Sequence, residues 1–147
     1  MVKIALDAGH GLYTSGKRCN VAVDPNQTRE WILNSRIALF IQQELKQYDN
    51  VQTLRLDDAT GRRDVPLSER AKAANEWKAH IILSIHHNAG AKLTKAGGIV
   101  VILDNDKFSA ASLRYQRLVY NALIAETGLK GNRSDSLTHQ PLGILDR

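Results

Sequence analysis

Residues 2–11 read Val-Lys-Ile-Ala-Leu-Asp-Ala-Gly-His-Gly, an apolar run that ends in small residues and a histidine. A second apolar run, residues 80–85, reads His-Ile-Ile-Leu-Ser-Ile and leads directly into His86-His87-Asn88. Both runs have the length and composition of buried strands. In parallel α/β sheets, functional loops gather at the carboxyl ends of the strands. We therefore expect His10 and His86 to lie near each other at one edge of a sheet.

The rest of the chain alternates between strand patterns and helix patterns. Strands are expected near 2–7, 51–56, 80–87, 99–103 and 142–145, helices near 28–47, 66–77 and 109–127, and a loop over 129–141. This order predicts an α/β fold in one domain over residues 1–147, with a twisted, mostly parallel β-sheet flanked by helices. Because such a domain rarely ends on a strand, we expect it to lack its last strand and helix, as in a C-terminally truncated chain.

Helical spacing also predicts which side chains face the core. In the first helix, one face carries Leu33, Ile37, Phe40, Ile41 and Leu45. In the third helix, the expected inner face carries Tyr115, Leu118, Val119 and Ala122.

Composition limits the class of protein. The 147 residues are 43% hydrophobic and 24% charged, which is ordinary for a globular domain. The single cysteine, Cys19, allows no disulfide within the chain, and no apolar run reaches the length of a membrane span. The net charge of +5 favours polyanionic partners such as nucleic acid, acidic membrane surfaces or an anionic cell wall, or it simply keeps the protein soluble.

Glu30 stands in the first turn of the expected first helix, between the two histidine segments. Two imidazoles and one carboxylate are a sufficient ligand set for a catalytic zinc ion, which uses three protein ligands and leaves a fourth position to water. Strand alternation places His86 and His87 on opposite faces, so we choose His86 as the ligand and His87 as a neighbour or packing residue. Each residue also has a simpler interpretation: a hydrogen-bonded structural histidine, or a glutamate that interacts with the helix dipole.

Two further polar residues adjoin these positions. Asp7 is expected to orient the imidazole of His10, as ligand histidines usually require, or to cap the strand end. Asn88 is expected to donate a hydrogen bond to substrate, although a role in forming the turn fits equally well.

The segments Ile4–Gly11 and Leu83–Ala89, together with Glu30, resemble the zinc-dependent N-acetylmuramoyl-L-alanine amidases, cell-wall hydrolases found as phage endolysins and bacterial autolysins. Residues 66–75, 97–101 and 142–147 are similar to later elements of that family. The resemblance implies one Zn²⁺ ion held by His10, Glu30 and His86. It also implies hydrolysis of the amide bond between N-acetylmuramic acid and L-alanine in bacterial peptidoglycan.

The family carries a second glutamate, a general base, on a final strand that would fall beyond Arg147. The glutamates of this chain do not match that place; they are Glu30, Glu44, Glu69, Glu76 and Glu126. The catalytic base is therefore unassigned, and a catalytically impaired peptidoglycan-binding fragment of the same fold is the alternative.

The N-terminus shows no export segment, because a strand pattern begins at Val2. With the resemblance, this predicts a phage lysin that is made in the host cytoplasm and released to act on the cell wall. The expected partners are peptidoglycan and anionic wall polymers, without nucleic acid binding or membrane insertion.

A nucleotide-binding protein is a further alternative. Residues 11–17 fit the spacing GxxxxGK of a phosphate-binding loop, and residues 100–104 fit the apolar run with aspartate that holds magnesium. Two features oppose it: Arg18 occupies the place of the required Ser or Thr, and residues 18–25 begin a helix poorly.

Overall fold

The computed structural model describes residues 1–87, 97–98, 100–103, 110–131, 137–140 and 143–144. The chain forms two compact units, Met1–Ala89 and Gly90–Arg147. One catalytic domain over residues 1–147, truncated at its C-terminus, stays a prediction.

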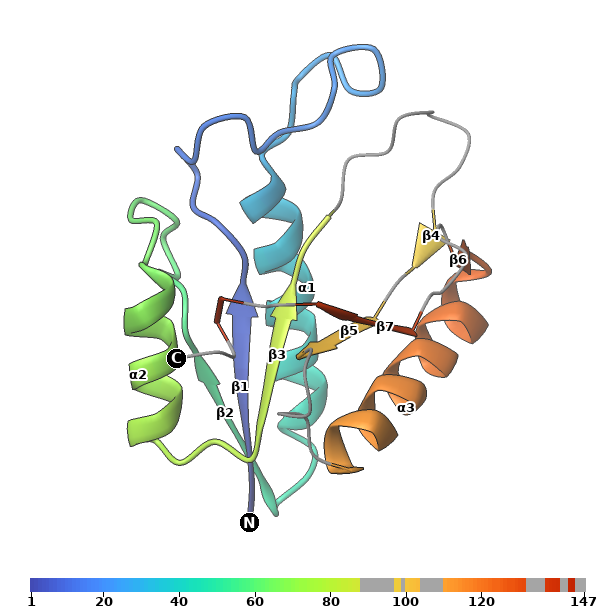
Figure 1. The fold of residues 1–147 in the computed structure, drawn as a ribbon. Coiled ribbons are helices and arrows are strands. Elements are labelled where there is room, and N and C mark those ends of the chain that lie inside the picture. Colours follow the sequence, from blue (N-terminus) through green and yellow to red (C-terminus); the bar gives the residue numbers. More distant parts are fainter. Residues whose placement is uncertain (88–96, 99, 104–109, 132–136, 141–142, 145–147) are drawn as a thin grey trace. The chain divides into compact units, whose positions relative to one another are not determined.

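The first unit is built on a three-stranded parallel sheet (Figure 1). Strand β1 (Val2–Ala8) lies between β2 (Val51–Arg55) and β3 (Ile81–Ile85). The register pairs Ala8 with Ile85, so the residues that follow β1 and β3 leave the sheet at the same edge. The predicted mixed α/β fold with a parallel sheet flanked by helices is confirmed.

Two helices flank this sheet: α1 (Glu30–Leu45) and α2 (Leu67–Glu76). Alternate residues of a strand point to opposite faces. On one face Ala5 packs with Leu56 and Ala74 of α2, and on the other Ala8 packs with Trp31 and Ala38 of α1. The small side chains of the central strand therefore let a helix approach it from either side.

The inner face of α1 differs from the predicted one. The residues that α1 buries are Glu30, Trp31, Asn34 and Ala38, whereas Ile37 and Phe40 of the predicted face are 38% and 56% exposed. Glu30 and Asn34 both have hydrogen-bond partners on the sheet side, the backbone of His87 and of Gly9. These polar contacts set the rotation of the helix and turn part of its apolar stripe outward.

In its described residues, the second unit contains two short parallel pairs of strands and one helix. Strand β4 (Gly97–Gly98) pairs with β6 (Lys130–Gly131), and β5 (Val100–Leu103) pairs with β7 (Leu137–Gln140). The loop predicted over 129–141 is therefore wrong at 130–131 and 137–140, because the polar residues at 138–140 do not show the apolar pattern of a strand that is held by backbone pairing. The strand predicted at 142–145 is also wrong where it is described, since Gly143 and Ile144 form a turn.

Helix α3 (Ala110–Thr127) begins and ends where the sequence predicts, with Gly128 in a left-handed conformation (φ 66°) just after it. Its inner face is not the predicted one. Gln116 is its buried residue and donates from Nε2 to the carbonyl of Val100 at 2.9 Å, while Tyr115, Leu118 and Val119 are exposed. The side chain of Gln116, which is hydrogen-bonded to β5, thus faces inward in place of the predicted apolar residues.

Within the described part of the chain, no helix has both the length and the apolar character needed to cross a membrane.

Candidate metal centre

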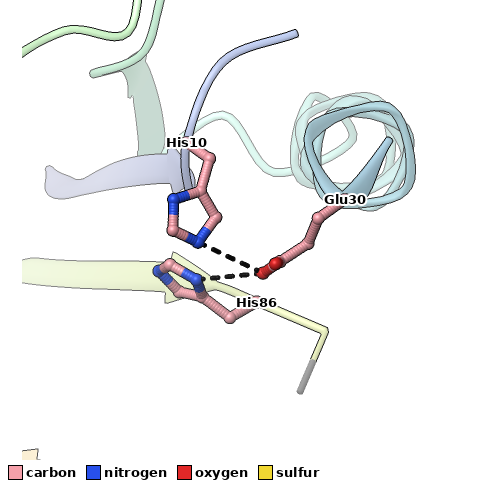
Figure 2. A group of neighbouring side chains, drawn as sticks. All are labelled: His10, Glu30 and His86. Atoms are coloured by element: carbon pink, nitrogen blue, oxygen red, sulfur yellow. Dashed lines mark hydrogen bonds and ion pairs between the residues drawn. The ribbon is translucent and has the colours of Figure 1, made fainter. Parts of the chain in front are cut away.

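Three side chains from three separate segments converge at the carboxyl edge of the sheet (Figure 2). His10 follows β1, His86 follows β3, and Glu30 opens α1 above them. The backbone N–H of Gly9 donates to the carbonyl of Ile85 at 3.0 Å, so the parallel pairing continues one step past β1. The topology therefore brings together the two histidine segments, as the sequence predicted.

The spacing of the ligand atoms fits a single divalent ion. Oε1 of Glu30 lies 3.5 Å from Nε2 of His10 and 3.2 Å from Nδ1 of His86, as the dashed lines in Figure 2 show. One ligand atom from each of the three residues lies within 4.8 Å of the others. Tetrahedral zinc with bonds of about 2.0–2.2 Å places neighbouring ligand atoms about 3.3–3.6 Å apart. The donor set and the two distances from Oε1 of Glu30 therefore suit zinc.

The two imidazoles meet edge to face, with ring centroids 4.9 Å apart and an interplanar angle of 85°. The pKa of His10 lies below its usual value of 6.5, mainly because burial disfavours the charged form. The Glu30 carboxylate opposes this shift, whereas the neighbouring His86 adds to it. A neutral imidazole at neutral pH is the form that binds a metal ion.

Glu30 is held by the segment that follows β3 and carries His86 and His87. Its Oε1 accepts a hydrogen bond of 3.1 Å from the backbone N–H of His87, and its side chain is only 10% exposed. Nδ1 of His87 lies 2.7 Å from Oδ1 of Asn34, one turn further along α1. His87 thus binds α1 twice and fixes the helix end to the end of β3. Burial also lowers the pKa of His87.

Asn34 was missed by the sequence analysis. It is fully buried, and its Nδ2 donates to the carbonyl of Gly9 at 3.0 Å, so it connects both histidine segments to α1. Its position four residues after Glu30 places it on the same helix face. That spacing in the sequence could have indicated that Asn34 lies beside the metal site.

Asp7 does not orient the imidazole of His10 as predicted. Its carboxylate accepts hydrogen bonds from Nη1 of Arg70 and, at 2.6 Å, from the hydroxyl of Ser84. Asp7 and Arg70 are both about 1% exposed, so they form a buried ion pair. A buried carboxylate needs a cationic partner more than it needs a neutral imidazole.

A second ion pair, in which the carboxylate is fully buried, holds the beginning of α1. The carboxylate of Asp57 accepts from Nε and Nη2 of Arg55 at 2.7 and 2.6 Å, and from the indole N–H of Trp31 at 3.0 Å. Because Trp31 directly follows Glu30, this network restrains the position of the carboxylate at the site.

Two sequence predictions remain, the nucleotide-binding alternative and the role of Asn88. Lys17 leads into loop rather than a helix, because α1 begins only at Glu30, so the phosphate-binding loop is wrong. Asp104 of the suggested magnesium segment lies outside the described residues, and so does Asn88, whose role in substrate binding stays a prediction.

The chain is similar to proteins described as N-acetylmuramoyl-L-alanine amidases. Residues 4–147 match the Amidase_3 family, described as N-acetylmuramoyl-L-alanine amidase. The N-acetylmuramoyl-L-alanine amidase CwlM of Bacillus licheniformis is 40% identical over 92 residues, which cover 61% of this chain and 33% of that protein. The sporulation-specific N-acetylmuramoyl-L-alanine amidase of Bacillus subtilis (strain 168) is 37% identical over 91 residues, 61% of this chain and 32% of that protein. The matched region thus spans about a third of these relatives.

Solved structures show the same fold. The catalytic domain of CwlV, an amidase from Bacillus (Paenibacillus) polymyxa var. colistinus, superposes with a TM-score of 0.79 at 21% identity, covering 99% of this chain and 73% of that one. The N-acetylmuramoyl-L-alanine amidase of Clostridium difficile 630 gives a TM-score of 0.78 at 21% identity, with the same coverage. Together with the family match over residues 4–147, these findings show that the chain belongs to the N-acetylmuramoyl-L-alanine amidase family.

Proposed function

We propose that the chain is a zinc-dependent amidase that cleaves the bond between N-acetylmuramic acid and L-alanine in bacterial peptidoglycan. The observation that carries the proposal is the convergence of His10, Glu30 and His86 on one point at the sheet edge. Membership of the amidase family supports peptidoglycan as the substrate, and the set of two histidines and one glutamate supports zinc as the metal.

His10, Glu30 and His86 would hold the ion. When bound, zinc lowers the pKa of a coordinated water and polarises a carbonyl group, which is the chemistry that amide hydrolysis requires. Burial lowers the pKa of His10, which favours its neutral form, and the N–H of His87 holds the Glu30 carboxylate toward both imidazoles. Asn34 fixes the two histidine segments to the same helix. These contacts preorganise the donor set before a metal ion arrives.

Within Met1–Ala89, the glutamates outside the metal site are not placed as proton acceptors. Glu69 pairs with Arg63, Glu76 lies 3.7 Å from Lys72, and Glu44 bonds to Gln47, all on exposed helix surface. That a second glutamate beyond Arg147 supplies this function stays a prediction from the family resemblance.

Digestion of purified peptidoglycan tests the activity. We expect release of L-alanine amino groups, loss of this release with a chelator, and recovery on addition of zinc, with metal analysis giving one ion per chain. Sedimentation of the protein with cell walls without any release would instead support the impaired peptidoglycan-binding fragment. ATP binding without zinc would contradict the proposal.

We also propose that the protein acts as a phage lysin, released from the host cytoplasm onto the wall. The net charge of +5 supports attraction to anionic wall polymers, and such attraction weakens with salt. Expression inside a susceptible host should cause lysis only after the membrane is permeabilised. Lysis without permeabilisation, or wall binding unaffected by salt, would contradict this proposal.

A further inference from the structure

His10 has a backbone conformation that a residue with a side chain rarely adopts. Its φ is 69°, in the left-handed region, where the Cβ atom crowds the following carbonyl. This conformation directs the imidazole of the metal site, since the ring follows the backbone that carries it. Other contacts must therefore hold the backbone of His10 in place.

Arg70 of α2 provides one half of the support. Its Nη2 donates to the carbonyl oxygen of His10 at 3.1 Å and to Oδ1 of Asp64 at 3.2 Å. Its Nη1 donates to Asp7 and to the carbonyl of Ala8 at 3.0 Å, and its Nε donates to the carbonyl of Val65 at 2.7 Å. The five N–H groups of a guanidinium thus have five acceptors, and the side chain is only 1% exposed. Arg70 is therefore fixed in orientation.

Thr14 provides the other half. The backbone N–H of Gly11 donates to Oγ1 of Thr14 at 2.9 Å, and the Thr14 hydroxyl donates to Oδ2 of Asp64 at 2.5 Å. Asp64 in turn accepts from Arg70 through its other oxygen. The peptide between His10 and Gly11 is therefore held at its C=O by Arg70 and at its N–H by Thr14, and Asp64 joins the two.

We propose that Arg70, Asp64 and Thr14 form a clamp on the His10–Gly11 peptide and thereby position the His10 imidazole for metal binding. The clamp rests on the proposed function, because it presumes the zinc site. Its members are positioning residues: Arg70 and Thr14 bond to the two ends of the His10–Gly11 peptide, and Asp64 bonds to both of their side chains. Groups that orient a metal ligand commonly affect metal affinity by about 10–100-fold.

The test uses Thr14, because replacing Arg70 would leave the buried Asp7 without its cation and endanger folding. We expect Thr14→Val to weaken zinc binding about tenfold, measured by competition with a chromophoric chelator, and Thr14→Ser to restore it to within about twofold of wild type. A second measurement needs no metal: the Gly11 amide should exchange its hydrogen faster in Thr14→Val than in wild type.

Thr60→Val is the matched control. Thr60 forms the same kind of threonine–aspartate pair, with its hydroxyl 2.9 and 2.8 Å from the oxygens of Asp58. Neither side chain of this pair is hydrogen-bonded to the His10–Gly11 peptide, whose partners are Arg70 and Thr14. We expect Thr60→Val to bind zinc like wild type. Equal zinc affinity of wild type and Thr14→Val, or equal weakening in Thr60→Val, would overturn the clamp.

A wild-type chain that binds no zinc would overturn the metal site of the proposed function. Gly11 exchange then decides the clamp separately: faster exchange in Thr14→Val supports it as a backbone device, and unchanged exchange overturns it.

Discussion

The imidazole of His86 packs directly against the backbone of Gly9. A Cβ atom on Gly9 would lie 2.1 Å from Cε1 and 2.4 Å from Nε2 of that ring, far inside van der Waals contact. The two histidine segments therefore pass each other at a distance that only glycine permits, and this close approach sets the position of one proposed metal ligand.

Gly9→Ala should displace the His86 ring and weaken zinc binding by about 100-fold, the upper end of what disturbed ligand support costs. Isothermal titration with zinc measures the change. Gly16→Ala is the control: its Cβ meets nothing within 4 Å, so only the strain of its φ of 72° is added. Unchanged zinc affinity in Gly9→Ala would contradict the packing described.

Glu30→Gln should weaken zinc binding by more than about tenfold and abolish any amidase activity, because a neutral amide replaces the one anionic ligand. Glu69→Gln is a matched control, since Glu69 also stands in the first turn of a helix but pairs with Arg63 at the surface. Chelator competition and peptidoglycan digestion check both variants. Equal zinc affinity of the two would show that Glu30 acts on its helix end and not on a metal.

Asp57→Ala should lower the free energy of unfolding by about 3–5 kcal/mol, because it removes a fully buried carboxylate and leaves the partly buried guanidinium of Arg55 without its partner. The Asp57 side chain is fully buried, and it also binds the indole of Trp31. Urea denaturation measures the loss. The exposed pair of Arg63 and Glu69 is the comparison: breaking it should change stability little. Similar losses from both pairs would contradict the importance of burial.

The stability of the metal-free protein should fall as the pH is lowered from about 6.5. The pKa of His10 is lowered in the folded state, so the unfolded chain takes up its proton first, and this uptake favours unfolding. His87 acts with the same sign, and neither residue contributes a pH dependence well above 6.5. Urea denaturation in a chelator between pH 7.5 and 5.5 measures the slope. The variant His10→Gln/His87→Gln should flatten it, and an unchanged slope would contradict the lowered pKa values.

The fold and the position of the site could be predicted because both depend on local signals. An apolar run followed by a polar turn marks a strand end, and parallel pairing then brings His10 and His86 to one edge. Glu30 could be identified because it lies in the first turn of a predicted helix between the two histidine segments. None of these inferences needed knowledge of side chains packed in the interior.

The supporting residues could not be predicted in this way. Arg70 and Asp57 are buried charges, and each has a partner far away in the sequence, Asp7 for Arg70 and Trp31 for Asp57. Helical spacing treats such residues as solvent-facing, and it therefore misplaced the inner faces of α1 and α3, where Asn34 and Gln116 point inward. A polar residue faces inward where its side chain can donate a hydrogen bond to a buried acceptor. The spacing of apolar residues in the sequence does not show where such an acceptor lies.

The three proposed ligands and the residues that support them all belong to Met1–Ala89. An engineer can therefore randomise positions in Gly90–Arg147 without altering a single donor atom of the ion site. Zinc content then serves as a check that the amino-terminal unit is intact in every such variant.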